Sequence, residues 1–196
     1  MSAILVAHGS KHGSTAEIAE VIGERLRSQG HTVDVCPAGD VRDLAGYDAI
    51  VVGSGVYMFH WQKDAMNLIK RHEAALRSRP TWLFSSGPTG GSEKADAAVE
   101  EARRSPSAFP APKEVAQRME RIGARGHATF PGAAGEGMGG IFERWVPKGD
   151  WRDFDAIRAY LLETLESTLE LLDKTPQDDE CLYFFRVALF HEDLRC

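Results

Sequence analysis

The chain has 196 residues, of which 43% are hydrophobic and 27% charged, a composition ordinary for one globular domain. Its formal net charge of −6 argues against a nucleic-acid binder held by phosphate contacts, and leaves small-molecule and protein partners open. The three cysteines, Cys36, Cys181 and Cys196, are too widely spaced for a disulfide framework or a zinc site, which fits a reducing compartment.

Signals for export and membrane insertion are weak. The segment Met1 to Val6 lacks the basic region and the long apolar stretch of a signal peptide. No apolar run approaches the roughly 20 residues that a bilayer-spanning helix needs. We therefore expect a cytoplasmic protein without a transmembrane segment.

Strands and helices alternate in the first half of the chain. Apolar runs predict strands at 3–7 and 47–53, and an alternation of apolar and polar residues predicts a strand at 32–36. Apolar residues at helical spacing predict helices at 14–29 and 62–76. Ser14 or Thr15 is expected to cap the first helix, and Gly30 to end it. A loop at 54–61 is expected between the third strand and the second helix.

The second half continues the alternation. The pattern predicts strands at 81–86 and 127–130, a glycine-rich loop at 87–92, helices at 94–104 and 113–123, and an amphipathic helix at 151–172. Five strands joined by helices indicate a doubly wound α/β fold, a parallel sheet with helices on both faces. We expect one domain at 1–172 and a C-terminal extension at 173–196. Ligands of such folds bind beyond the carboxyl ends of the strands.

The loop from His8 to Thr15, HGSKHGST, joins the first strand to the first helix and is suited to hold a phosphate group. Small residues let backbone N–H groups converge on an anion, and the N-terminus of the following helix adds free N–H groups and a positive dipole end. Ser10, Ser14 and Thr15 add hydroxyl donors, and Gly13 allows a close approach of the backbone. The sequence therefore predicts a phosphate-binding loop here.

These residues also carry a family resemblance. The segment Val6 to Ile22 resembles the FMN-phosphate signature of flavodoxins, with Ala7 and His8 standing where flavodoxins carry a larger apolar residue and an aromatic. YDAIVVGSGVY, RPTWLFSSGPTG and GDWRDFDAI resemble the flavodoxin-domain family that includes the menaquinone-dependent protoporphyrinogen IX dehydrogenase. The resemblance covers Ala3 to Leu172 and implies a flavodoxin-like five-stranded sheet with FMN as the cofactor.

The resemblance places the cofactor-binding residues in three loops. They are Ser10, Lys11, His12, Gly13, Ser14 and Thr15 in the first loop, Ser54, Gly55, Val56, Tyr57 and Trp61 after the third strand, and Ser86, Gly87, Pro88, Thr89 and Gly90 after the fourth. Tyr57 or Trp61 would stack on the isoalloxazine ring. The third loop lacks an aromatic of its own, so one face of the ring is expected to be open to a substrate. No catalytic acid or base stands out.

Several functions fit these motifs. The first is an FMN-dependent oxidoreductase with a small-molecule redox substrate, on the resemblance a porphyrinogen, and a quinone as acceptor. The second is an electron-transfer flavodoxin whose partner is another protein. The third, of another class, is a tetrapyrrole metal chelatase using His8, since ILVAHGS resembles the opening of such enzymes. The fourth is a flavodoxin-like binding module that has lost FMN. Bound flavin separates the first two from the last two.

Three further segments carry weaker signals. Gly135 to Gly140 spells GxGxxG but does not sit between a strand and a long helix, so a mobile loop over the site is expected in place of a second dinucleotide site. Lys113, Arg118, Arg121 and Arg125 are expected to form a solvated helix face. The apolar run Cys181 to Phe190 is expected to pack on the domain or on a second copy, which leaves a homo-oligomer open; a membrane or quinone contact is the alternative.

Overall fold

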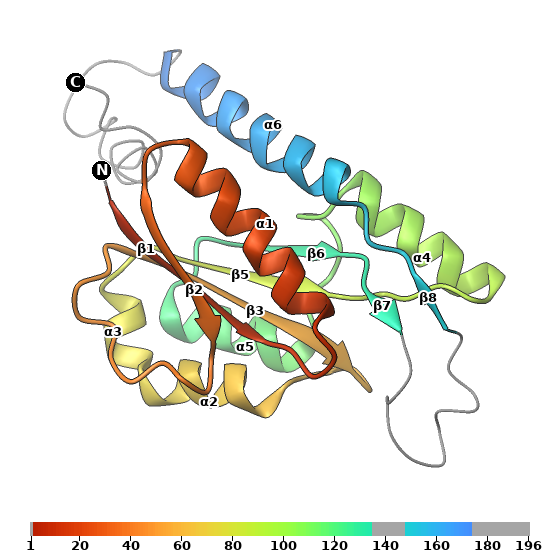
Figure 1. The fold of residues 1–196 in the computed structure, drawn as a ribbon, viewed down its shortest axis with the longest axis horizontal. Coiled ribbons are helices and arrows are strands. Elements are labelled where there is room, and N and C mark those ends of the chain that lie inside the picture. Colours follow the sequence, from red (N-terminus) through yellow and green to blue (C-terminus); the bar gives the residue numbers. More distant parts are fainter. Residues whose placement is uncertain (1, 135–147, 174–196) are drawn as a thin grey trace.

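The fold is described here from a computed structural model, which covers residues 2–134 and 148–173, with side chains to residue 163. Five parallel strands form its central sheet: β1 (Ala3–Gly9), β2 (Thr32–Pro37), β3 (Ala49–Tyr57), β5 (Thr81–Ser86) and β6 (Gly126–Phe130). Their order is β2-β1-β3-β5-β6 (Figure 1). The predicted doubly wound, flavodoxin-like sheet is therefore confirmed.

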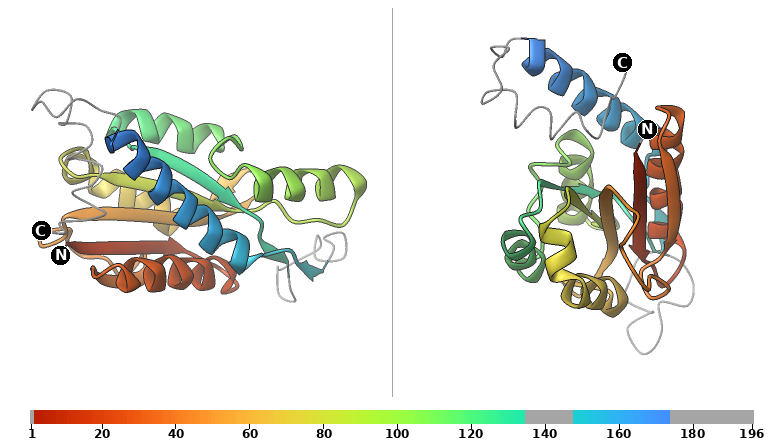
Figure 2. Two further views of the ribbon diagram at one scale, coloured as in Figure 1. Left: turned by 90° about the horizontal axis from the view of Figure 1, so that it is seen from above. Right: turned by 90° about the vertical axis from the view of Figure 1, so that its left-hand side faces the viewer.

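Helices cover both faces of the sheet, because side chains that alternate along the strands are apolar on both sides. Along β1, Ile4 and Val6 belong to one apolar cluster and Leu5 and Ala7 to the other. The first cluster includes residues of α1 (Ser14–Ser28) and α6 (Phe154–Asp173). The second includes residues of α2 (Lys63–Arg71), α3 (Glu73–Arg77) and α5 (Lys113–Ile122), and α4 (Glu93–Arg104) contacts β6 (Figure 2).

The region after the third strand differs from its prediction. β3 runs on to Tyr57 and pairs antiparallel with β4 (His60–Trp61), so most of the expected loop at 54–61 is a hairpin. Its turn is made by Met58 and Phe59, both in the left-handed region with φ of 50° and 66°. The pairing of Val56 with Trp61 satisfies backbone groups that a loop would leave to water. The helix expected at 62–76 is divided at His72 into α2 and α3.

Two helix starts also differ. The residue before α1 is Gly13, with φ of 87°, and no described side chain caps this helix, so the expected cap by Ser14 or Thr15 is wrong. The helix expected from Trp151 begins only at Phe154, because the Asp153 carboxylate accepts a hydrogen bond from the Ala156 N–H (2.8 Å) and so acts as the cap. The residues before it form β8 (Gly149–Asp150), which pairs with β7 (Ala133–Ala134).

Two sequence motifs and one boundary lie outside the described residues. These are the GxGxxG segment Gly135 to Gly140, the apolar run Cys181 to Phe190 and the expected extension at 173–196 beyond its first residue. Their predictions stay predictions. In the part of the chain that is described, no helix combines the length and the apolar character needed to cross a bilayer.

Candidate functional site

The loop between β1 and α1 presents the free N–H groups of the first helical turn. No described side chain caps α1, so these N–H groups have no acceptor from that source. Ser10, Gly13 and Ser14 are half-buried, whereas Lys11 and His12 are exposed. Thr15 is only 3% exposed. The predicted loop thus has an anion-accepting end, with one hydroxyl at its base and two polar side chains at its rim.

The next loop comes close to this one. A Cβ on Gly55 would lie 3.1 Å from the Thr15 Oγ1 atom, and a Cβ on Gly9 would lie 3.0 Å from the Cβ atoms of Ala65 and Gln62. Glycine at 9 and 55 therefore lets the end of β1, the end of β3 and the start of α2 meet without a side chain between them. At the rim, the Lys11 ammonium lies 5.9 Å from the centre of the Tyr57 ring.

Two residues expected to contact a cofactor here are instead committed to the hairpin. Ser54 is fully buried, and its hydroxyl donates to the Gly55 carbonyl (3.0 Å) and accepts from the Gln62 N–H (2.9 Å). Trp61 is 4% exposed, packs in the core, and donates its indole N–H to Ser85 Oγ (2.9 Å). Because no ring face of Trp61 is open, its expected stacking role is not supported by this geometry, and Tyr57 is the remaining candidate.

The hairpin is held by α5, through a contact that was not predicted from the sequence. One Glu114 carboxylate oxygen accepts the Trp61 backbone N–H (2.8 Å), and the other lies 3.3 Å from His60 Nδ1. The turn beyond it projects two large apolar side chains, Met58 and Phe59, which are 68% and 87% exposed. Glu114 therefore fixes where Tyr57 and this exposed turn lie.

The loop after β5 is tied to the segment that follows β6. The Gly87 N–H donates to the Phe130 carbonyl (2.8 Å), and the Gly132 N–H donates to the Pro88 carbonyl (3.0 Å). Ser86 is buried, and Thr89 is half-buried. The same segment reaches the first loop, because the Ala133 N–H donates to Ser14 Oγ (3.2 Å). All three predicted loops are thus brought to one edge of the sheet, at the carboxyl ends of the strands.

An aromatic side chain from a distant part of the chain lies against this loop. A Cβ on Gly90 would come within 2.7 Å of Trp151 Cε2, so the indole covers Gly90 directly. The backbone N–H of Trp151 donates to the Gly132 carbonyl (3.1 Å), and the backbone carbonyl of Trp151 accepts from Arg103 Nη2 (2.7 Å). The loop has no aromatic of its own, as noted from the sequence, but Trp151 supplies one. The helical spacing of Trp151 predicted a place inside a helix, so its position beside Gly90 was not expected from the sequence.

The neighbouring Arg152 offsets an acidic side chain at the first loop. Its side chain is 10% exposed and pairs with Glu17 (3.0 Å) in the first turn of α1 and with Asp150 (2.6 Å). These carboxylates raise the pKa of Arg152, which therefore stays charged. A negative charge at Glu17 would repel an anion at the helix N-terminus, and the guanidinium balances it.

His8 lies on β1 just before the first loop. Its side chain is half-buried, and its Nδ1 atom has no hydrogen-bond partner among the described residues. Burial lowers the pKa of His8, although the Glu20 charge opposes this, so its ring is neutral at neutral pH. Within 2–134 and 148–173, no group of three or more His, Cys, Asp or Glu side chains is arranged to hold a metal ion.

A doubly wound sheet with an uncapped, glycine-rich β1–α1 loop defines the class of α/β proteins that bind a phosphate-bearing ligand at the carboxyl ends of their strands. Residues 5–133 match the sequence profile of the family described as the flavodoxin domain, and the chain belongs to this family. The flavodoxin-domain part of the resemblance found in the sequence is therefore confirmed.

One curated relative and several solved structures are similar to this chain. The relative is the NAD(P)H dehydrogenase (quinone) of Cupriavidus metallidurans, 36% identical over 76 residues, with 28% of this chain and 38% of that protein covered. The match thus spans well under half of the relative's length. Oxidised flavodoxin 1 of Bacillus cereus has a TM-score of 0.51 and 15% identity, with 84% of this chain and 98% of that chain covered. The Streptococcus pneumoniae TIGR4 flavodoxin has a TM-score of 0.52 and 17% identity, with 85% of this chain and 99% of that chain covered. These structures support the fold alone.

Proposed function

We propose that the chain binds FMN at this edge of the sheet and acts as an FMN-dependent oxidoreductase with a quinone as its small-molecule redox partner. One observation carries the proposal: the first turn of α1 has no side-chain cap, and the Thr15 hydroxyl in that turn lies beside Gly55 at the end of β3. The chain that carries this arrangement belongs to the flavodoxin-domain family. Bound FMN would supply reversible electron and hydride transfer. The family match includes His8, and so favours a flavin over a metal chelatase.

The phosphate of the cofactor would be held by the first loop. The N–H groups of the first turn of α1 and the hydroxyls of Ser10, Ser14 and Thr15 are its donors, with Gly13 allowing the turn. Ser14 already accepts the Ala133 N–H, which leaves its own hydroxyl hydrogen to donate. Lys11 and His12 lie at the rim, where their contribution is expected to be smaller because they are exposed.

The ring of the cofactor would lie between the other two loops. Tyr57 offers an aromatic face, and Gly55 and Val56 offer backbone beside it. Opposite, Ser86, Gly87, Pro88, Thr89 and Gly90 form the second wall, backed by the Trp151 indole. Ser54 and Trp61, whose side chains are engaged within the hairpin, would shape this site without contacting the ring. The wall is therefore more enclosed than the sequence of the third loop suggests.

The FMN proposal is tested by titrating FMN-depleted full-length protein with FMN and following flavin fluorescence. Thr15→Val removes the hydroxyl at nearly constant volume, and Thr15→Ser is the matched control that keeps it. A lost hydrogen bond to a charged group costs about 1.5–3 kcal/mol, so Thr15→Val should weaken binding by about 10- to 150-fold. Riboflavin, which has no phosphate, should bind the three proteins alike. A protein that ignores FMN, or a Thr15→Val variant with unchanged affinity, would contradict the proposal.

The choice of a quinone rests on the name of the Cupriavidus metallidurans relative, of which only a part is matched. It is tested by mixing the FMN-loaded protein with NADH or NADPH and a water-soluble quinone, and by screening a porphyrinogen in the same way. Multiple turnovers per flavin support an enzyme. The second candidate, an electron-carrier flavodoxin, is favoured by the net charge of −6, which suits docking to a basic redox protein. A carrier would exchange electrons with such a protein and turn over no small substrate.

A further inference from the structure

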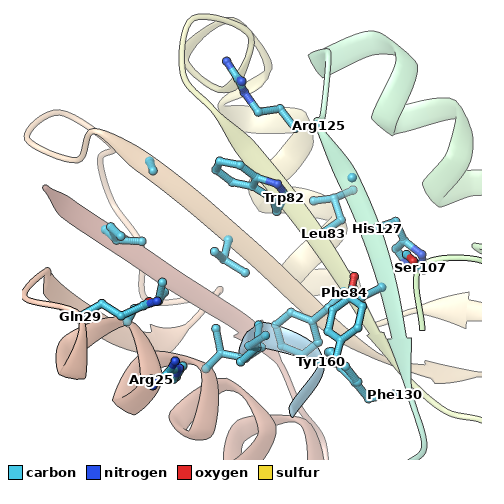
Figure 3. A pocket seen from close by; sticks show the side chains of 18 residues that line it. Arg25, Gln29, Trp82, Leu83, Phe84, Ser107, Arg125, His127, Phe130 and Tyr160 are labelled. Atoms are coloured by element: carbon cyan, nitrogen blue, oxygen red, sulfur yellow. The ribbon is translucent and has the colours of Figure 1, made fainter. Parts of the chain in front are cut away.

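The face of the sheet beside α6 contains an open groove of about 690 Å³. Its lining is mainly apolar and comes from the sheet, α1 and α6: Ile4, Leu26, Val51, Trp82, Phe84 and Leu161. Figure 3 shows the Trp82 and Phe84 rings along the strands, with Tyr160 nearby. Parallel sheets are normally covered on both faces, so an apolar strip that is only partly buried in this position calls for a segment to cover it.

The groove is separate from the proposed cofactor site. Ile4, Ala49, Trp82 and Gly126 line it, and each is the first or second residue of its strand. The groove therefore begins at the starts of the strands and runs along this face as far as Phe130, the last residue of β6, but none of the residues proposed to bind the cofactor lines it. The inference drawn from it does not depend on the flavin.

The course of α6 indicates which segment can reach the groove. α6 contacts α1 near its start, and Figure 2 shows it rising away from the sheet toward Asp173. In Figure 1 that end of α6 lies over the starts of the strands, at the end of the sheet where β1 begins. The chain that continues from Asp173 therefore leaves the described structure on the same face as the groove and at the end where the groove begins.

We propose that the apolar segment CLYFFRVALF, Cys181 to Phe190, covers this groove. The seven residues from 174 to 180 can span up to about 25 Å when extended, which is enough to turn back from the end of α6. Burying the aromatic and aliphatic side chains of this segment against the partly buried strip would be favourable by the hydrophobic effect. The segment is otherwise too short to cross a bilayer and is interrupted by Arg186.

Charges on the groove and on the segment complement each other. Arg25 and Arg125 line the groove on opposite sides (Figure 3). The Arg25 Nε atom is buried without a hydrogen-bond partner among the described residues. In the sequence, Asp178, Asp179 and Glu180 come directly before the apolar segment. An acidic run followed by an apolar run matches a groove with an apolar floor and basic margins.

Two other occupants would leave different traces. A groove of this volume is within the range of small-molecule pockets, and a second copy of the chain would also bury an apolar face. The chain's own segment is the one tethered beside the groove by α6.

The proposal is tested in the full-length protein by photo-crosslinking, with Phe185 replaced by p-benzoylphenylalanine and products mapped by mass spectrometry. The expected crosslink joins residue 185 to peptides carrying Trp82 to Phe84 or Tyr160 to Leu161 of the same chain. The same photoreactive residue at Ala97, an exposed position on α4, is the control for random reaction. Crosslinks between two chains would overturn the proposal in favour of a second copy, and crosslinks only outside the groove would overturn it altogether.

A matched pair of substitutions on α6 sharpens the test. Leu161→Glu places a carboxylate in the groove wall and should lower the yield of the intramolecular crosslink several-fold, because burying an unpaired charge is unfavourable. Leu162→Glu changes the neighbouring residue, which is 42% exposed, and should leave the yield unchanged. Circular dichroism establishes that both variants fold. An equal yield from the two variants would overturn the assignment of the segment to this groove.

Discussion

His127, a half-buried histidine of β6, gives the molecule a pH-dependent stability that can be worked out from its contacts. The His127 Nε2 atom lies 2.9 Å from Ser85 Oγ, which also accepts the Trp61 indole N–H (2.9 Å). Burial lowers the pKa of His127 from 6.5 to about 4. At pH 7.5 and above the ring is therefore largely uncharged in both the folded and the unfolded chain, and it contributes little pH dependence there.

The lowered pKa of His127 determines how the stability of the fold changes with pH. Below pH 6.5 the unfolded chain takes up a proton that the folded chain excludes, so stability falls as the pH falls toward 4 and changes no further below it. The loss from His127 amounts to about 2 kcal/mol between pH 7.5 and 5, and to about 3 kcal/mol over the whole window, since one pKa unit corresponds to 1.36 kcal/mol. Burial also lowers the pKa values of His8 and His72, which act in the same direction.

Urea unfolding at a series of pH values from 7.5 to 5 measures this effect. His127→Gln removes the titrating group while keeping an amide near Ser85, so the stability of the variant should fall by about 2 kcal/mol less than that of the natural chain. Val99→Ala, a buried substitution without a titrating group, should lower stability at every pH and run parallel to the natural chain. If the His127→Gln curve instead coincides in slope with that of the natural chain, His127 is not held in its neutral form by the fold.

Three further predictions concern the scaffold. Gly53→Ala should destabilise the protein by about 3 kcal/mol or more in urea unfolding, because its Cβ would clash with the Phe84 ring. Gly126→Ala is the control: its Cβ would contact only Trp82 Cδ1, at 3.6 Å, and should be tolerated. Similar losses of stability in the two variants would contradict the packing of Phe84 against β3. Asp153→Ala should lower the free energy of unfolding by about 1 kcal/mol, because it removes the cap of α6. Asp155→Ala removes a carboxylate that pairs with Arg158 on the surface and should lower it much less. Equal losses in the same assay would rule out the cap. Glu114→Ala should speed proteolytic cleavage between Met58 and His60, because the hairpin loses its contacts with α5. Glu120→Ala, on the same helix, is the control, and equal cleavage rates in the two variants would count against these contacts.

Strands such as β1, β3 and β5 were predictable from the sequence because each carries an apolar run, and β2 because its residues alternate between apolar and polar. The hairpin of β3 and β4 was not, since its turn is Met58-Phe59 and carries none of the glycine or asparagine that usually occupies left-handed turn positions. The start of α6 was misplaced because Trp151 fits the helical spacing, although Asp153 at the cap position is a signal that could have moved it.

The phosphate-binding loop could be predicted because its signal is local, small residues between a strand and a helix. The surroundings of the ring could not be predicted in the same way. Trp61 looked like an exposed loop aromatic, and it is buried because Ser85 and Glu114, far away in the sequence, hold it. Trp151 reaches Gly90 only through the pairing of β7 with β8. Such contacts depend on tertiary packing, which periodicity does not report.

The pairing of β7 with β8 also sets an order of events during protein synthesis. The first loop, the hairpin and the loop at Gly90 all leave the ribosome before Trp151, which lies 61 residues after Gly90. At about 5–20 residues per second, several seconds separate the emergence of these two residues. In a nascent chain the residues of the first loop, the hairpin and the Gly90 loop are therefore available to fold before the indole that covers Gly90 has been made.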